Sequence, residues 1–264
     1  MTNTRQMFFD VDEMMREFDE VLKNNIHFDV VTIVGEGEPT LYSGLGDLIN
    51  QIKKKTKKPV AVITNGALFY DPKLRAELYE ADIVLPTMDA YNDETFRKIN
   101  RPHGTIDFNM VSDGLIKFSR EYKGQLWIEL MLIENINDDD DSLRKYKEAL
   151  GKFKYDRLYI NTPIRPPAEP GIKAVSHEKI NHAVEILGGN PIDLLDSEGF
   201  HSDIEDDYEA IKSIIKRHPM NQFEIEGFLD SRGCSDIDLI LKKLKEDSSV
   251  NCINYKGYET FRLK

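Results

Sequence analysis

The first forty residues change from a helical to a strand-like pattern of apolar positions. Between Val11 and Leu22 the apolar side chains recur at helical spacing, which predicts an amphipathic helix that buries one face. The next run, Phe28–Val34, is short and rich in β-branched residues, and it leads into Gly35-Glu36-Gly37-Glu38-Pro39. This pattern predicts a buried strand that ends in a turn.

The same alternation continues through most of the chain. Further strands are predicted at Pro59–Thr64, Asp82–Met88, Gln125–Ile133 and Arg157–Thr162, and further helices at Leu45–Lys57, Pro72–Glu80, Asn109–Tyr122, Ser142–Lys152 and Ser176–Leu187. Strands that alternate with helices pair in parallel through right-handed crossovers, so we expect an α/β fold: a barrel, part of a barrel or a doubly wound sheet. In all three, ligands bind at the carboxyl ends of the strands.

The alternation stops near Asp203. Three helical patterns follow, and then a predicted hairpin with Lys256-Gly257 at its turn; these segments are Asp206–Arg217, Gln222–Ser231, Asp236–Lys245 and Cys252–Leu263. Their order favours a small winged-helix-like domain over residues 203–264, after a first domain over residues 1–202. The second domain has ten basic and thirteen acidic residues, which makes a poor surface for DNA, so contact with a protein or positioning of a tRNA is an equal alternative.

The composition argues against a nonspecific DNA-binding, membrane-spanning or secreted protein. The net charge of -12 opposes nonspecific binding to DNA. No apolar run reaches the roughly 18 residues of a membrane helix, and the N-terminal segment lacks the apolar core of a secretory signal. Two cysteines, Cys234 and Cys252, indicate a reducing compartment. We therefore expect a cytoplasmic protein without a membrane partner, and no metal site, because the histidines lack metal-binding spacing.

Polar residues stand where the predicted strands end, although a buried parallel strand uses such residues mainly where it opens to a ligand. They are Glu36, Gly37, Glu38 and Pro39 after the first strand, Thr64 and Asn65 after the second, Asp89 after the third, Glu129 within the fourth, and Asn161 and Arg165 at the last. Gly37 would let a ligand approach the backbone closely, where peptide groups can bind an amine or a carboxylate.

Each of these residues also has an ordinary structural explanation. Gly-Glu-Pro and Asn-Gly are common turn sequences. Asp89 would serve as the N-cap of a helix at Glu94–Lys98. Glu129 interrupts a run that is expected to be buried, so its carboxylate needs a partner, and Arg165 is the candidate. The structural and the functional interpretations both remain open at this point.

Several segments, in this order, resemble the radical SAM superfamily, and within it the iron-sulfur oxidoreductase branch related to the tRNA wyosine-base synthases. The resemblance covers roughly residues 6 to 200 and rests on Val31–Leu41, Val62–Leu68, Asp82–Ala90, Thr95–His103, Glu129–Asn137 and Asn161–Glu169. It implies a partial (β/α) barrel that binds S-adenosylmethionine. In the complete protein a [4Fe-4S] cluster would supply the electron that cleaves it reductively. A tRNA base is one substrate that it suggests.

The resemblance also assigns roles to residues. Glu36, Gly37, Glu38 and Pro39 form the turn that binds the methionine amine of S-adenosylmethionine, with Glu36 in the place of the family's first glycine. Thr64, Asn65, Asp89 and Asn161 lie beside the same cofactor. Arg101, Glu129 and Arg165 are then the expected substrate contacts.

One departure from the family is large. The family places a CxxxCxxC loop after its first barrel strand, and we expect these 264 residues to contain neither that strand nor that loop, since they have only two cysteines. The thiolates of that loop hold the cluster, so we expect this chain to hold none. We also expect the unpaired edge of the first strand, Val30–Val34, to associate with another chain.

Three interpretations follow from the departure. The chain is the cofactor and substrate part of a radical SAM enzyme whose cluster segment lies elsewhere. Alternatively, it is a noncatalytic descendant that binds a nucleotide-like ligand or tRNA. A third interpretation is an ordinary barrel enzyme that uses Asp89, Glu129 and Arg165 for acid-base chemistry.

Overall fold

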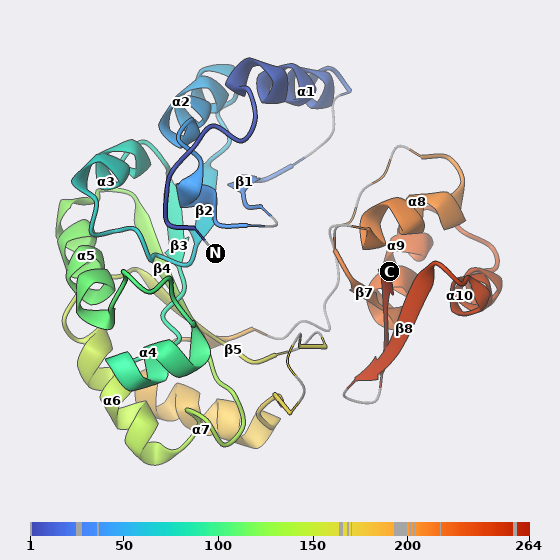
Figure 1. The fold of residues 1–264 in the computed structure, drawn as a ribbon. Helices are drawn as coiled ribbons and strands as arrows, with labels where there is room; N and C mark the ends of the chain where they lie inside the picture. The colour runs from blue at the N-terminus through green and yellow to red at the C-terminus, as the bar shows by residue number, and fades with distance from the viewer. Residues whose placement is uncertain are drawn as a thin grey trace. The chain divides into compact units, whose positions relative to one another are not determined.

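The computed structural model describes residues 2–24, 28–35, 37–163, 166–167, 169, 171–192, 200, 202, 204–216, 218–255 and 258–264. The chain forms two compact units, and each is described by itself (Figure 1). The first unit comprises Met1–Asn161 and Val175–Pro191, and the second comprises Thr162–Ala174 and Ile192–Lys264.

The first unit is a parallel sheet flanked by helices, as the sequence predicts. Its strands pair in chain order: β1 Val31–Ile33, β2 Val60–Thr64, β3 Ile83–Pro86, β4 Gln125–Met131, β5 Arg157–Asn161 and β6 Asn190–Pro191. Its helices are α1 Val11–Lys23, the 3-10 turn η1 Pro39–Leu41, α2 Leu45–Lys55, α3 Pro72–Leu78, α4 Asp93–Ile99, α5 Phe108–Glu121, α6 Asp140–Leu150 and α7 His177–Leu187. The α/β class and the parallel partial barrel are confirmed.

In the described part of this unit, six α-helices begin where a short polar side chain caps them, whereas α2 begins after Gly44 without such a cap. Side-chain oxygens accept hydrogen bonds from backbone N–H groups in the first turn, which would otherwise lack partners. The capping residues in this unit are Asp10, Asp71, Asn92, Asp107, Asp139 and Ser176. Helix α4 is capped by Asn92 and Thr95, so the interpretation of Asp89 as its N-cap is wrong.

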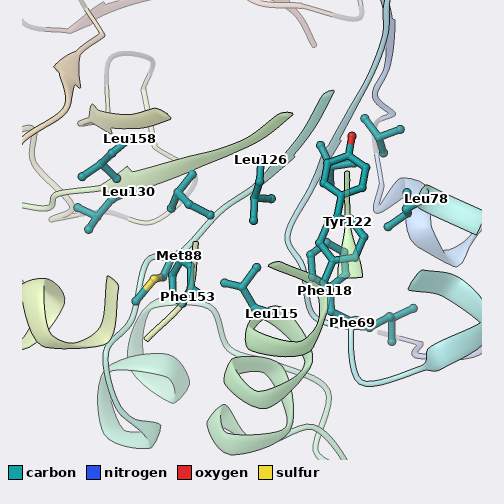
Figure 2. Packing of buried hydrophobic residues seen from close by; sticks show 14 of the residues in the cluster. Phe69, Leu78, Met88, Leu115, Phe118, Tyr122, Leu126, Leu130, Phe153 and Leu158 are labelled. Carbon is teal, nitrogen blue, oxygen red and sulfur yellow. The ribbon is translucent and has the colours of Figure 1, made fainter. Parts of the chain in front are cut away.

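The sheet buries one face under the helices and leaves the other partly open. On β4, Leu126, Ile128 and Leu130 are at most 3% exposed, and Figure 2 shows Leu126 and Leu130 in the same cluster as Leu115 and Phe118 of α5. Of the alternate residues of β4, Gln125 is exposed, and the others are half-buried. Glu129 therefore does not interrupt a buried run as expected, because it belongs to the open face.

Strand β1 also differs from its prediction. It spans three residues, and Val30 and Val34 beside it are 38% and 55% exposed. The predicted strand was longer and buried, but β1 is the edge of the described sheet and pairs only with β2. An edge strand loses the packing that a central strand receives on its second side.

The second unit contains three helices and an antiparallel sheet. These are α8 Asp207–Ile215, α9 Gln222–Ser231, α10 Ile237–Glu246, β7 Met220–Asn221, β8 Val250–Tyr255 and β9 Tyr258–Leu263, with the sheet order β7-β9-β8. Its own core includes Ile211, Ile225, Leu244 and Phe261. Among the described residues, no helix is long and apolar enough to cross a membrane.

The loop after β4 is held by one buried amide. Asn137 is fully buried, and its Oδ1 accepts the N–H of Ile133 at 2.7 Å. Its Nδ2 donates to the carbonyl of Met131 at 2.9 Å and to the hydroxyl of Tyr146 at 2.8 Å. The Tyr146 hydroxyl in turn donates to the Asp89 carbonyl at 2.6 Å. This network joins the ends of β3 and β4 to α6.

We expect Asn137→Ala to lower the free energy of unfolding by about 3 kcal/mol, because the Ile133 N–H and the Met131 carbonyl lose their bonds to this side chain and the Tyr146 hydroxyl loses one of its two. Urea denaturation would measure the change. The control is Asn109→Ala, an exposed residue of α5, which should change the free energy by less than about 0.5 kcal/mol. Equal effects of the two substitutions would contradict the role of this network.

Candidate cofactor and substrate site

The turn after β1 is fastened to the end of β2 by the carboxylate of Glu38. Its Oε1 accepts hydrogen bonds from the Thr40 N–H at 2.9 Å, the Thr40 hydroxyl at 2.7 Å and the Thr64 hydroxyl at 2.5 Å. Its Oε2 accepts the Asn65 N–H at 2.8 Å. With four donors, this carboxylate holds the turn in place, and a ligand would meet the backbone of the turn instead.

Gly37 leaves open space in that turn. A Cβ atom at this position would meet no other atom within 4 Å. Packing within the chain therefore does not require glycine here. Close approach of a ligand to the backbone is a reason for it that the chain's own contacts do not supply.

The end of β2 forms its own tight turn. The Thr64 hydroxyl accepts the Gly66 N–H at 3.0 Å, and Asn65 Oδ1 accepts the Ala67 N–H at 2.9 Å. Gly66 has a φ of 67°, a conformation that favours glycine. The interpretation of Asn65-Gly66 as a common turn is therefore correct. This turn places Asn65 at the same edge of the sheet as Glu38.

A cavity of about 360 Å³ lies beside this edge. Among the residues that line it are Glu38, Asn65 and Arg101, together with Asn100, Phe96 and His103. Asn100 Oδ1 is buried without a hydrogen-bond donor among the described residues. A smaller neighbouring cavity shares Asn65, Phe96 and Asn100 and also reaches Asp89.

Asp89 joins the end of β3 to the end of β4. Its Oδ1 accepts the Met131 N–H at 3.1 Å, and its Oδ2 accepts Nδ2 of Asn100 at 3.2 Å. Part of the residue's surface is exposed, whereas its carboxyl group lies in the interior. Burial raises the pKa of Asp89 to about 6, and the charge of Glu129 acts in the same direction, whereas the bond from Met131 opposes them.

Glu129 and Asn161 form a second polar pair on the open face of the sheet. Asn161 Nδ2 donates to Glu129 Oε1 at 3.0 Å. Neither residue lines the two cavities described above. Arg165, the predicted partner of Glu129, lies outside the described residues, as does Glu36 of the first turn.

The structure thus brings some of the predicted residues together and separates others. Glu38, Asn65 and Arg101 share the larger cavity, so Arg101 is a neighbour of the predicted cofactor turn. Thr64 holds that turn through its hydroxyl, which donates to Glu38, and Pro39 begins the 3-10 turn η1 that follows. Asp89 lies in the smaller cavity, and Glu129 with Asn161 is further along the sheet.

Comparison with known proteins places the chain in a family. The family model described as the radical SAM superfamily matches residues 2–146, more than half of the chain. A UPF0026 protein from Methanocaldococcus jannaschii is 32% identical over 274 residues, covering 100% of this chain and 83% of that protein. The chain belongs to the radical SAM superfamily.

Two further similarities cover a smaller part of the other protein. A protein named GTPase Obg from Brachyspira hyodysenteriae is 39% identical over 183 residues, which are 69% of this chain and 27% of that protein. This chain has no GxxxxGK[ST] phosphate loop. A radical SAM methyltransferase from Sphaerobacter thermophilus has the same fold with a TM-score of 0.53, at 17% identity, over 69% of this chain and 55% of that one.

Radical SAM proteins in general use S-adenosylmethionine and a [4Fe-4S] cluster, and the two groups fit this chain differently. The cavity, the open space at Gly37 and the unpaired acceptor of Asn100 fit a ligand that carries an amine. The cluster does not fit, because Cys234 and Cys252 are two free thiols in the second unit. In the described part of the chain, no three His, Cys, Asp or Glu side chains group as a metal site.

Sequence patterns missed the residues that support the site. Asn100 lies at the end of α4, where an asparagine is an ordinary helix terminus, and its only signal is its place in the segment Thr95–His103 of the family resemblance. Asn137 and Tyr146 act through buried hydrogen bonds that depend on the folded loop. Asn137 lies within the segment Glu129–Asn137, which likewise carries part of the family resemblance.

The raised pKa of Asp89 predicts a pH dependence. The folded state binds this proton more tightly than the unfolded state, whose aspartate pKa is near 3.8. Its contribution to stability is therefore present below about pH 4 and is lost as the pH rises through about 6. Relative to Asp89→Asn, the wild-type free energy of unfolding should fall by up to about 3 kcal/mol between these limits.

Urea denaturation of both proteins from pH 4.5 to 7.5 would measure this difference. Asp113→Asn, at an exposed position of α5, is the control and should give a profile parallel to that of the wild type. A parallel profile for Asp89→Asn as well would show that the carboxyl titrates normally.

Glu38→Gln should loosen the turn after β1. The amide keeps one oxygen, but its NH₂ group then faces N–H or O–H donors that have lost their acceptor. This should lower the free energy of unfolding by about 1–3 kcal/mol. Amide hydrogen exchange should accelerate at Thr40 and Asn65, whereas the exposed control Glu80→Gln should leave both unchanged. Unchanged exchange in Glu38→Gln would mean that the carboxylate does not hold the turn.

Proposed function

We propose that this chain binds S-adenosylmethionine in the cavity beside Glu38 and is the cofactor and substrate part of a radical SAM enzyme. The observation that carries the proposal is the turn at Gly37. It is fixed by four hydrogen bonds to Glu38, yet it leaves open the space next to its own backbone. Such a turn suits a ligand that hydrogen-bonds to peptide groups.

The residues divide the binding between them in this proposal. Glu36, Gly37 and Pro39 offer backbone groups to the amine, and Glu38 and Thr64 hold that turn. Asn65 and Asp89 lie beside the ribose, and Asn161 lies toward the adenine. S-adenosylmethionine itself supplies the carbon-sulfur bond that radical SAM enzymes cleave. Asp89 would hold or release a proton at its carboxyl near neutral pH, because burial raises its pKa to about 6.

In this proposal the cluster is held by cysteines that these 264 residues do not supply. A second candidate is a noncatalytic protein that retains the cofactor cavity. It is favoured by the position of both cysteines in the second unit, away from the candidate turn in the chain. The third interpretation, an acid-base enzyme that uses Asp89, Glu129 and Arg165, has no support from the cavities, because Glu129 lines neither of them.

The second unit is proposed as a winged-helix-like domain over residues 203–264, next to a first domain over residues 1–202. Its three helices and β7-β9-β8 sheet support this assignment. With ten basic and thirteen acidic residues, it would hold a protein or tRNA substrate through specific contacts. The free thiols Cys234 and Cys252 support a reducing, cytoplasmic location.

Association through β1 also remains a proposal. The Val31 N–H donates at 2.9 Å to the carbonyl of Pro59, the residue before β2, so the peptide groups of Thr32 face the other side of the strand. Among the described residues, no strand pairs with that side. A strand from another chain would satisfy these groups.

Calorimetric titration with S-adenosylmethionine tests the cavity. The chain should bind the cofactor, and Gly37→Val should reduce the affinity at least about tenfold, because its branched side chain fills the space where the ligand meets the backbone. The variant should fold normally, since a Cβ atom there meets no other atom within 4 Å.

The control is Gly151→Val at the end of α6, where a Cβ atom would make ordinary contacts at 3.4 Å or more. This variant should bind as the wild type does. If Gly37→Val also binds as the wild type does, the ligand does not approach the turn and the proposed cavity is wrong.

A further inference from the structure

Three aromatic and cationic side chains form a cluster on the open face of the sheet. The guanidinium of Arg157 lies 4.6 Å from the ring centroid of Trp127. The rings of Trp127 and Tyr159 meet edge to face at 5.8 Å, and Arg157 Nη1 donates to the Tyr159 hydroxyl at 3.2 Å. We call Trp127, Arg157 and Tyr159 the aromatic platform.

The register of β4 and β5 places a carboxylate in the same row as Tyr159, one row beyond Trp127 and Arg157. Trp127 is opposite Arg157, and Glu129 is opposite Tyr159 in the next row toward the carboxyl ends. Successive residues on one face of a strand are about 7 Å apart, which is close to the length of a small planar ring with its substituent. A ring on the platform therefore brings its edge to Glu129.

The platform is open to a ligand, unlike the other face of the same strands. Leu126, Ile128 and Leu158 are at most 3% exposed under the helices. Trp127 and Tyr159 are only half-buried, and Arg157 is exposed. A sheet face that only needed an apolar cover would not carry a guanidinium stacked on an indole beside a carboxylate.

Glu129 adds a chemical preference. Its Oε1 accepts a hydrogen bond from Asn161, whereas its Oε2 has no donor among the described residues. A carboxylate only accepts hydrogen bonds, so a ligand group that meets Oε2 must donate one. An exocyclic amino group on a planar ring meets this requirement, and a ring carbonyl in the same place does not.

We propose that the aromatic platform and Glu129 bind an amino-bearing planar ring of the substrate. The ring stacks on the aromatic and guanidinium surfaces, as nucleobases do on such side chains, and its amino group donates to Glu129 Oε2. The assignment of the ring to the substrate rests on the proposed function, because the cofactor cavity is lined by other residues. The binding site itself needs no cofactor.

Trp127 is the only tryptophan of the chain, so its fluorescence reports on this site alone. The probes are two matched pairs of nucleosides: adenosine against inosine, and cytidine against uridine. The members of a pair differ in an exocyclic amino group against a carbonyl oxygen, and in the neighbouring ring nitrogen, which accepts a hydrogen bond in the first member and donates one in the second. With S-adenosylmethionine at saturation, adenosine and cytidine should quench the fluorescence and bind about tenfold more tightly than their partners.

Two variants separate stacking from hydrogen bonding. Glu129→Gln keeps an oxygen for Asn161 and replaces the free acceptor by an NH₂ donor, so the preference should reverse toward inosine and uridine. Arg157→Ala should weaken all four nucleosides alike, because it removes only stacking area. The exposed control Glu148→Gln on α6 should match the wild type.

The proposal is overturned if no nucleoside changes the fluorescence, if both members of each pair bind equally, or if Glu129→Gln leaves the preference unchanged. Displacement of adenosine by S-adenosylmethionine would also overturn it, because the ring would then be the cofactor's own. These outcomes differ from failure of the proposed function, which would appear as the absence of S-adenosylmethionine binding in the calorimetric titration while the nucleosides still bind.

Discussion

The parallel sheet buries one face under helices and leaves the other partly open, and every candidate site residue depends on this asymmetry. The alternate residues of β4 show it directly, because Ile128 and Leu130 are fully buried while Trp127 and Glu129 are half-buried. The buried face supplies the apolar area that stabilises the unit. The open face is consequently free to carry a carboxylate and an arginine that a two-sided core would exclude.

The polar groups at the strand ends are positioned by hydrogen bonds rather than by packing. Glu38 joins the turn after β1 to β2, and Asp89 joins β3 to the N–H of Met131 on β4. Asn137 then fixes the loop that follows Met131. The Glu38 bonds therefore join the ends of β1 and β2, the Asp89 bond joins the ends of β3 and β4, and Asn137 fixes the loop after β4. Loss of one of these hydrogen bonds would therefore loosen the strand end that it holds.

Sequence patterns predicted most of the fold and only part of the site. Long periodic segments such as α5 and β4 lie close to their predicted positions, because their burial repeats along the chain. The strands β6 and β7 were not predicted, because two residues are too few to show a pattern and only their pairing with a neighbouring strand defines them. The turn at Glu38 carried a recognisable motif, whereas the support from Asn100 depends on a contact eleven residues away along the chain. The half-buried position of Glu129 could not be predicted, because it depends on which face of the sheet the helices cover.

Asp89 connects the two candidate regions, because it touches both. Its carboxyl accepts bonds from Asn100, which lines both cavities, and from Met131, which is two residues beyond Glu129. The charge of Glu129 is one of the causes that raise the pKa of Asp89. A cation that paired with Glu129 would remove part of that repulsion and so lower the pKa of Asp89. Occupancy of the open face by a charged group would thus be felt at the cavity through a single carboxyl, without any movement of the backbone.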